Sequence, residues 1–222
     1  MNAAAISTEL LKRPDLPLVI NSIELALREE STRRQEFRQW LDEDKKAEFI
    51  NGEVVLHSPV KLRHLKVSQQ LSLLLGVYVQ RKKSGVVMIE KATIGLTRND
   101  YEPDICFFNS EKAAQFTEDQ MIFPAPDFVV EILSKSTAAN DRGIKRIDYA
   151  AHGVREYWII DPNRQTLEQF IRLGEDTEFM PANKLLPDQT VQSRAVEGFE
   201  IPVAALFDET ACAQAMVALT NA

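Results

Sequence analysis

The sequence predicts an α/β fold in which a mixed central β-sheet is flanked by α-helices. Strand-forming runs follow one another closely in the middle of the chain, at residues 86–90, 92–96, 104–108 and 127–133. Helical spacing of apolar residues follows the last of these runs over residues 139–153, which implies a βα unit.

A second pair of runs predicts that the sheet contains both parallel and antiparallel strands. Residues 154–162, "VREYWIIDP", form a near-continuous apolar run that ends at Asp161 and Pro162, as a buried strand does. Residues 166–173, "TLEQFIRL", alternate well enough to be its antiparallel neighbour across a short turn.

Two helices and a hairpin are predicted before this region. A helix is expected from Ser31, which suits an N-cap, and the pair Asn51 and Gly52 suits a tight hairpin turn. Residues 61–85 carry a broad apolar stripe and predict a long helix. We therefore divide the chain into an N-terminal arm or docking segment (1–30), a main domain (31–208) and a C-terminal tail (209–222).

Composition excludes several classes of protein. The net charge of -7 argues against a general nucleic-acid coat protein, although a local basic groove remains compatible with it. Cys106 and Cys212 show no CxxC spacing, which argues against a thiolate zinc site. No apolar stretch is long enough to cross a bilayer and the N-terminus does not resemble a secretory signal, so the cytoplasm is the expected location.

One carboxylate stands inside an apolar strand. In "PDFVVEILSKST", Glu131 shares a strand face with Val129 and Leu133, so it is buried if both faces of the sheet are covered. A buried carboxylate must be neutral, paired or bound to a metal. Upstream, "YEPDICFF" repeats the pattern, because Asp104 enters another apolar strand.

Acids from two neighbouring strands and a lysine are suited to metal-assisted phosphodiester hydrolysis. Asp104 and Glu131 would supply oxygen ligands to Mg²⁺, and Lys145, on the following helix, could orient or help deprotonate the attacking water. Glu48 could add a third acid. Mn²⁺ suits such oxygen ligands about equally.

Five segments taken together resemble one family. These segments are "EFINGEVV...SP", "PDICFF", "VVEILSKST", "DRGIKRIDY" and "GVREYWIIDP", and they occur in order from about Ala47 to Pro162. They are similar to the Uma2-type (DUF820) proteins of the PD-(D/E)XK superfamily, which implies a restriction-endonuclease-like core.

The resemblance also implies site residues and partners. Asp104 and Glu131 resemble the two metal-binding acids of the motif, and Glu48 the additional N-terminal acid. Leu133 stands where the superfamily usually has its lysine, so the sequence departs from the simple pattern, and Lys145 would take that role. The resemblance implies a Mg²⁺-dependent endonuclease (or Mn²⁺-dependent), DNA as substrate, and a homodimer.

Other interpretations remain open at this stage. Glu131 could form a structural ion pair with Arg142 or Lys145, which would leave a non-catalytic DNA-binding or oligomerisation module. RNA could replace DNA as substrate. The basic segments 61–66 and 80–85 are either solvated helix faces or contacts to a DNA backbone. The histidines His57, His64 and His152 lack metal-ligand spacing and are expected to be surface or capping residues.

Overall fold

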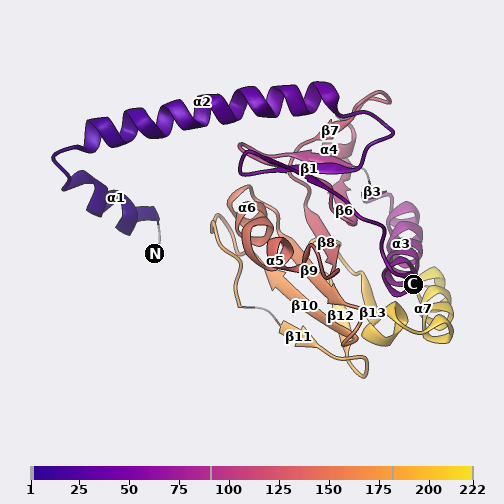
Figure 1. Ribbon diagram of the computed structural model, residues 1–222. Helices are drawn as coiled ribbons and strands as arrows, with labels where there is room; N and C mark the ends of the chain where they lie inside the picture. Colours follow the sequence, from indigo (N-terminus) through magenta and orange to yellow (C-terminus); the bar gives the residue numbers. More distant parts are fainter. Residues whose placement is uncertain (1–2, 91, 182, 222) are drawn as a thin grey trace.

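A six-stranded mixed sheet forms the centre of the molecule. We describe a computed structural model over residues 3–90, 92–181 and 183–221 (Figure 1). The strands of the central sheet are, in spatial order, β11 (Asn183–Leu185), β10 (Thr166–Ile171), β9 (Glu156–Asp161), β8 (Phe128–Ile132), β6 (Ile105–Asn109) and β3 (Gly85–Ile89). Strands β8 and β9 are parallel, whereas the other neighbouring pairs are antiparallel. The predicted mixed sheet and the antiparallel β9–β10 pair are therefore confirmed.

A smaller sheet packs beside the first. Its strands are, in order, β2 (Glu53–Leu56), β1 (Ala47–Ile50), β5 (Asp100–Tyr101), β4 (Thr93–Gly95) and β7 (Ile122–Phe123). The turn between β1 and β2 is the predicted one, since Asn51 and Gly52 have φ angles of 51° and 87°. A separate two-stranded sheet pairs β12 (Thr190–Gln192) with β13 (Glu200–Pro202). The sequence did not predict the division of the strands into three sheets.

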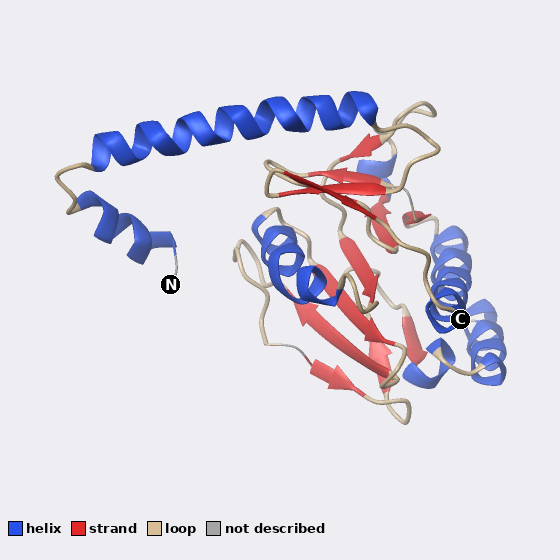
Figure 2. Ribbon diagram, in the orientation of Figure 1, coloured by secondary structure: helices blue, strands red, loops and turns tan. Residues whose placement is uncertain are grey.

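Both faces of the central sheet are covered. On one face, α3 (Leu62–Lys82), α7 (Glu209–Asn221) and the short 3-10 helix η2 (Val203–Leu206) pack on side chains such as Phe107 and Val130. On the other face, residues of α6 (Arg146–Ala151) and of the smaller sheet pack on side chains such as Val129. Figure 2 shows the helices on either side of the strands. A short helix, α4 (Ser110–Ala113), follows β6.

The ends of the chain differ from the predicted picture in two ways. The segment expected as a C-terminal tail forms α7, whose residues Cys212, Ala215 and Leu219 are part of the main core. The N-terminal helix α2 runs from Leu16 to Trp40, so the predicted start at Ser31 is wrong. The helix begins after Asp15 and carries Pro17 in its first turn, where proline is well tolerated because that N–H has no intrahelical partner.

Helix α2 is attached to the body through its second half. Asp100 of β5 accepts hydrogen bonds from the guanidinium groups of Arg34 and Arg38, with N–O distances of 2.6 to 3.0 Å. Phe37 packs on Phe49 of β1. The first half of α2 and α1 (Ala3–Leu11) extend away from the sheets (Figure 1) and expose large apolar side chains such as Leu18. Whether residues 1–30 act as a dimerisation arm stays a prediction.

The helix after β8 has an unusual middle. It begins as α5 (Ala138–Asn140), widens into one π-helical segment, η1 (Asp141–Lys145), and continues as α6. Such wide turns are rare and occur frequently at functional sites. In the residues that the structure describes, no helix is both long enough and apolar enough to span a membrane.

Candidate active site

Asp104 and Glu131 meet because their strands are neighbours. Strands β6 and β8 are antiparallel, with Ile105 opposite Val130. Extended by one residue, this register sets Asp104 opposite Glu131. The Asp104 carboxylate accepts a hydrogen bond from the backbone N–H of Ile132, at 2.7 Å between N and Oδ2. The two acids thus lie at the junction between the start of β6 and the end of β8.

Both acids line one small cavity. Its volume is about 70 Å³, and Lys145, Glu102 and His64 also line it. Glu131 is 4% exposed, which confirms that the carboxylate in the apolar strand is buried. Titratable side chains from several separate segments of the sequence therefore line a single small cavity.

Lys145 connects the acids of the site. Its Nζ atom lies 2.7 Å from Glu48 Oε1, 3.1 Å from Glu131 Oε1 and 3.2 Å from Asp141 Oδ1. An ammonium group has three N–H donors, so each carboxylate can receive one. Burial lowers the pKa of Lys145, but the three acids outweigh it and raise that pKa well above its usual value. This arrangement favours the orienting role of Lys145 over the proton-accepting one.

Glu48 contacts the site through Lys145. It comes from β1, is 1% exposed, and its Oε1 also accepts a hydrogen bond from the backbone N–H of Glu102 at 2.9 Å. His57 Nε2 lies 3.6 Å from its other oxygen. Burial raises the pKa of Glu48, but the charge of Lys145 and the contact with His57 outweigh it and lower that pKa to about 2. Glu48 is therefore held as a carboxylate behind the lysine.

The site carries more negative than positive groups. Burial raises the pKa of Glu131 well above its usual value, with Lys145 opposing the shift, and burial also raises the pKa of Asp141. Burial raises the pKa of Glu102 to about 7, and its Oε2 atom has no hydrogen-bond partner among the described residues. The two lysines that line the cavity, Lys145 and Lys46, are outnumbered by these acids, so the cavity is suited to a cation.

The donor set fits a hard divalent ion. Asp104 and Glu131 offer carboxylate oxygens at one cavity, which Mg²⁺ and Mn²⁺ accept. Over the residues that the structure describes, no three His, Cys, Asp or Glu side chains are grouped so as to hold a metal by themselves. This is compatible with Mg²⁺, which usually binds through one or two carboxylates and keeps several waters.

The sequence prediction was incomplete in several respects. The structure brings Asp104, Glu131, Lys145 and Glu48 together, while Arg142 pairs instead with Glu168. Asp141, four residues before Lys145, is 1% exposed and also belongs to the buried cluster.

Two further side chains were misjudged or missed. His64 was expected to be a surface or capping residue, and that expectation is wrong. It is 5% exposed, with Nε2 3.2 Å from Asp104 Oδ2. Glu102 was not considered, although it stands two residues before Asp104, and the same alternation of strand faces would have indicated it.

Comparison with known proteins agrees with this architecture. The family model Uma2, described as "Putative restriction endonuclease", matches residues 34–204. This chain belongs to the Uma2 family. The matched range includes both strands that supply Asp104 and Glu131, as well as Glu48 and Lys145.

Two individual relatives were also found. The Uma2 chain is 26% identical over 145 residues to "Uncharacterized protein sll1609" of Synechocystis, a match that covers 62% of this chain and 81% of the relative. Its fold matches the crystal structure of "a putative nuclease belonging to DUF820" from Anabaena variabilis, with a TM-score of 0.68 and 19% identity. That match covers 80% of this chain and 97% of the other. The restriction-endonuclease-like fold expected from the sequence is thereby confirmed.

Proposed function

We propose that this Uma2 protein is a metal-dependent endonuclease that hydrolyses DNA phosphodiester bonds. One observation carries the proposal: Asp104 and Glu131, from two neighbouring strands, line the same small buried cavity as Lys145. The description of the family and that of the Anabaena protein both refer to nucleases, which supports the same class of reaction.

Each residue has a distinct role in this proposal. Asp104 and Glu131 hold the metal ion, which is Mg²⁺ or Mn²⁺. When bound, the ion neutralises phosphate charge and lowers the pKa of a coordinated water. Lys145 is a positioning residue, because its ammonium group holds the carboxylates of Glu131 and Glu48. Glu48 in turn fixes Lys145.

Asp104 is itself held in place by backbone and side-chain contacts. The N–H of Ile132 donates to its Oδ2, and His64 Nε2 lies 3.2 Å from the same oxygen. These contacts restrict the rotation of the carboxylate, so its remaining oxygen is oriented before any ion binds. Preorganised ligands of this kind reduce the cost of ordering the site on binding.

Plasmid nicking tests the activity. Wild-type protein, Glu131→Gln and Asp104→Asn should be incubated with supercoiled DNA and Mg²⁺ or Mn²⁺, and again with EDTA. We expect nicking by the wild type with metal and none by either variant. Each variant keeps the shape of the side chain while removing the charge that binds metal. Circular dichroism checks that the variants fold.

Glu168→Gln is the matched control. This substitution also removes one carboxylate, but Glu168 pairs with Arg142 outside the cavity, so nicking should persist. DNA binding without nicking, by every protein and with either metal, would instead identify the non-catalytic DNA-binding alternative. A parallel reaction with RNA of the same sequence decides between DNA and RNA as substrate.

A further inference from the structure

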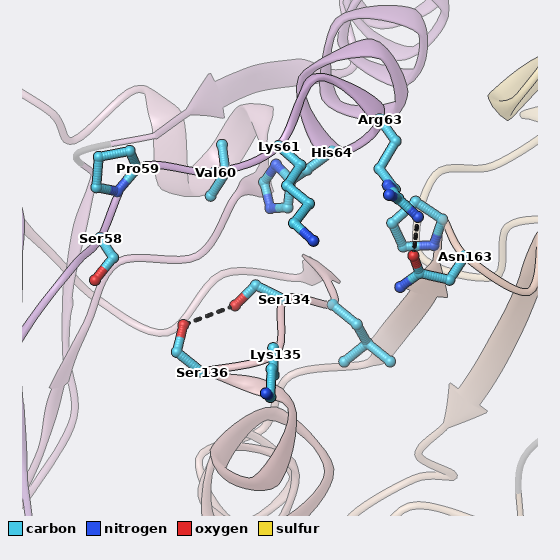
Figure 3. A pocket seen from close by; sticks show the side chains of 12 residues that line it. Ser58, Pro59, Val60, Lys61, Arg63, His64, Ser134, Lys135, Ser136 and Asn163 are labelled. Atoms are coloured by element: carbon cyan, nitrogen blue, oxygen red, sulfur yellow. Dashed lines mark hydrogen bonds between the residues drawn. The ribbon is translucent and has the colours of Figure 1, made fainter.

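A larger pocket adjoins the acidic cavity. Its volume is about 510 Å³, and it shares Ser58, Val60, His64, Ser134 and Ser136 with the walls of the acidic cavity. Its walls come from the start of α3, from the loop that follows β8, and from the turn between β9 and β10 (Figure 3). A ligand that reached the acids through this pocket would first contact these three segments.

The start of α3 places positive charge at this pocket. Lys61 is the N-cap residue, Arg63 lies in the first turn, and that turn contains no acidic residue. Within the described part of the chain, no side-chain capping hydrogen bond is made at this helix start. The N-terminus of a helix carries a partial positive charge, so basic residues there are unfavourable by themselves. A bound anion would turn this local repulsion into attraction.

His64 gives a second and independent indication of a ligand. It lines both the pocket and the acidic cavity and is 95% buried, since its exposed fraction is 5%. Its Nε2 lies next to Asp104, whereas its Nδ1 has no hydrogen-bond partner within the described part of the chain. Buried polar atoms without a partner are uncommon in native proteins and call for an explanation such as a ligand or water.

The opposite wall adds another cation and two hydroxyl groups. Lys135 lies between Ser134 and Ser136, whose Oγ atoms are 3.1 Å apart, and Figure 3 shows Lys61 extended toward this loop. Among the described residues, no carboxylate pairs with Lys61 or Lys135, and both are exposed. Arg63 donates to Asn163 at the third wall. Pro59, Val60 and Leu133 supply apolar surface beside these groups.

We propose that this pocket binds the DNA backbone phosphate next to the one that is cleaved. Lys61, Lys135 and the N-terminus of α3 contact the phosphate, and the apolar side chains contact its sugar. The inference rests on the proposed nuclease function, because it places the cleaved phosphate in the adjoining acidic cavity. It also explains how a chain with a net charge of -7 attracts DNA, since the positive charge is concentrated at the mouth of the site.

The salt dependence of DNA binding tests the inference. Fluorescence anisotropy with a labelled 20-base-pair duplex, in buffer without divalent metal, measures affinity between about 50 and 200 mM salt, where phosphate contacts have a strong effect. Each phosphate that the protein neutralises contributes about 1 to the slope of log K against log salt. Because both lysines contact the same phosphate, we expect the slope to fall by about 1 in the double variant Lys61→Gln/Lys135→Gln and by less in either single variant.

Lys184→Gln is the control. Lys184 is exposed on β11, and its substitution changes the net charge by the same amount as either single variant. Its slope should equal that of the wild type. An unchanged slope in the double variant, or no DNA binding by the wild type, would overturn the phosphate site. The plasmid assay on the same preparations is a separate readout. If the wild type nicks DNA but the slope of the double variant is unchanged, only the phosphate pocket is refuted. If the slope falls in the double variant but the wild type does not nick DNA, only the nuclease function is refuted.

Discussion

The Nζ atom of Lys145 lies 2.7 Å from Oε1 of Glu48, and both side chains are 1% exposed. The same ammonium group also contacts Glu131 and Asp141. A cation shared by three buried acids holds β1, β8 and the π-helical segment at one point. The site and the fold are therefore coupled through a single side chain.

Replacing Lys145 by Met should destabilise the protein strongly. The methionine has a similar length, but the acids would remain buried without their cation, and breaking such a buried pair costs about 3–5 kcal/mol. Urea denaturation measures the loss in the free energy of unfolding. As a control, Lys66→Met removes a lysine that pairs with Glu209 on the surface, and should have little effect. Equal stability of the two variants would contradict the buried-cluster interpretation.

Mg²⁺ should stabilise the folded protein. A ligand that binds only the folded state raises the free energy of unfolding by about 1.4 kcal/mol at ten times its Kd. Differential scanning calorimetry over a Mg²⁺ titration should therefore show a rising Tm for the wild type. Asp104→Asn should remove the increase, while Glu200→Gln, a change at an exposed acid, should retain it. A wild-type Tm that does not change at any Mg²⁺ concentration would argue against the metal site.

Asp100 should anchor helix α2. Its carboxylate is fully buried and receives hydrogen bonds from both Arg34 and Arg38. Asp100→Asn removes the charge that pairs with both guanidinium groups, so we expect a loss of about 3 kcal/mol in the free energy of unfolding. Hydrogen exchange should become faster in the second half of α2. Unchanged exchange there would show that apolar contacts, such as Phe37 on Phe49, are sufficient.

The contribution of Asp100 to the free energy of unfolding should also depend on pH. Burial raises the pKa of Asp100, but Arg34 and Arg38 outweigh it and lower that pKa below its usual 3.8. Below pH 3.8 the unfolded chain binds a proton that the folded protein does not, so this stabilisation is lost as the pH falls through the lowered pKa. The difference in unfolding free energy between wild type and Asp100→Asn should therefore narrow below about pH 4. A constant difference would contradict the assigned charge pairing.

Glu156 is a buried carboxylate with a structural role. It is fully buried at the start of β9, and five groups donate hydrogen bonds to it. These donors are Trp158 Nε1, Gln169 Nε2, Ser193 Oγ, and the backbone N–H groups of Arg194 and Ala195. They connect the central sheet to the segment between β12 and β13. Protein donors alone satisfy this carboxylate, whereas Oε2 of Glu102 in the candidate site has no hydrogen-bond partner among the described residues.

Glu156→Ala should leave these donors without an acceptor. Each unsatisfied buried group costs about 1–3 kcal/mol, although water entering the space would offset part of this, so we expect a loss of about 3 kcal/mol or more. Thermal unfolding measures it. Metal-dependent nicking by the folded fraction should persist, because Glu156 does not line the acidic cavity. Loss of nicking at full stability would show instead that Glu156 influences the reaction.

The local patterns that predicted well are those in which neighbouring residues decide the structure. The turn at Asn51 and Gly52 needs positive φ angles, which these residues adopt readily. The apolar runs at β8 and β9 predicted strands that are buried on both faces, and the structure buries successive residues of both strands. The start of α2 was misplaced because Ser31 and Asp15 both suit a helix start, and propensity alone does not decide between them. In the structure Ser31 lies inside the helix, which runs without a break from Leu16 to Trp40.

The sequence by itself determined the alternation that buries Glu131 and the order of strands and helices around it. Only the tertiary structure decided that His64 and Glu102 join the same cluster and that the neighbouring pair of Asp141 and Lys145 is buried in it, because these placements depend on elements that are far apart in the chain. Hydrophobic periodicity reports which face of an element is buried, whereas a polar partner depends on how whole elements are placed against one another. Asp104, Glu131 and Glu48 were therefore visible in the sequence as candidate acids, whereas the lysine contact that Glu131 and Glu48 share was visible only in the fold.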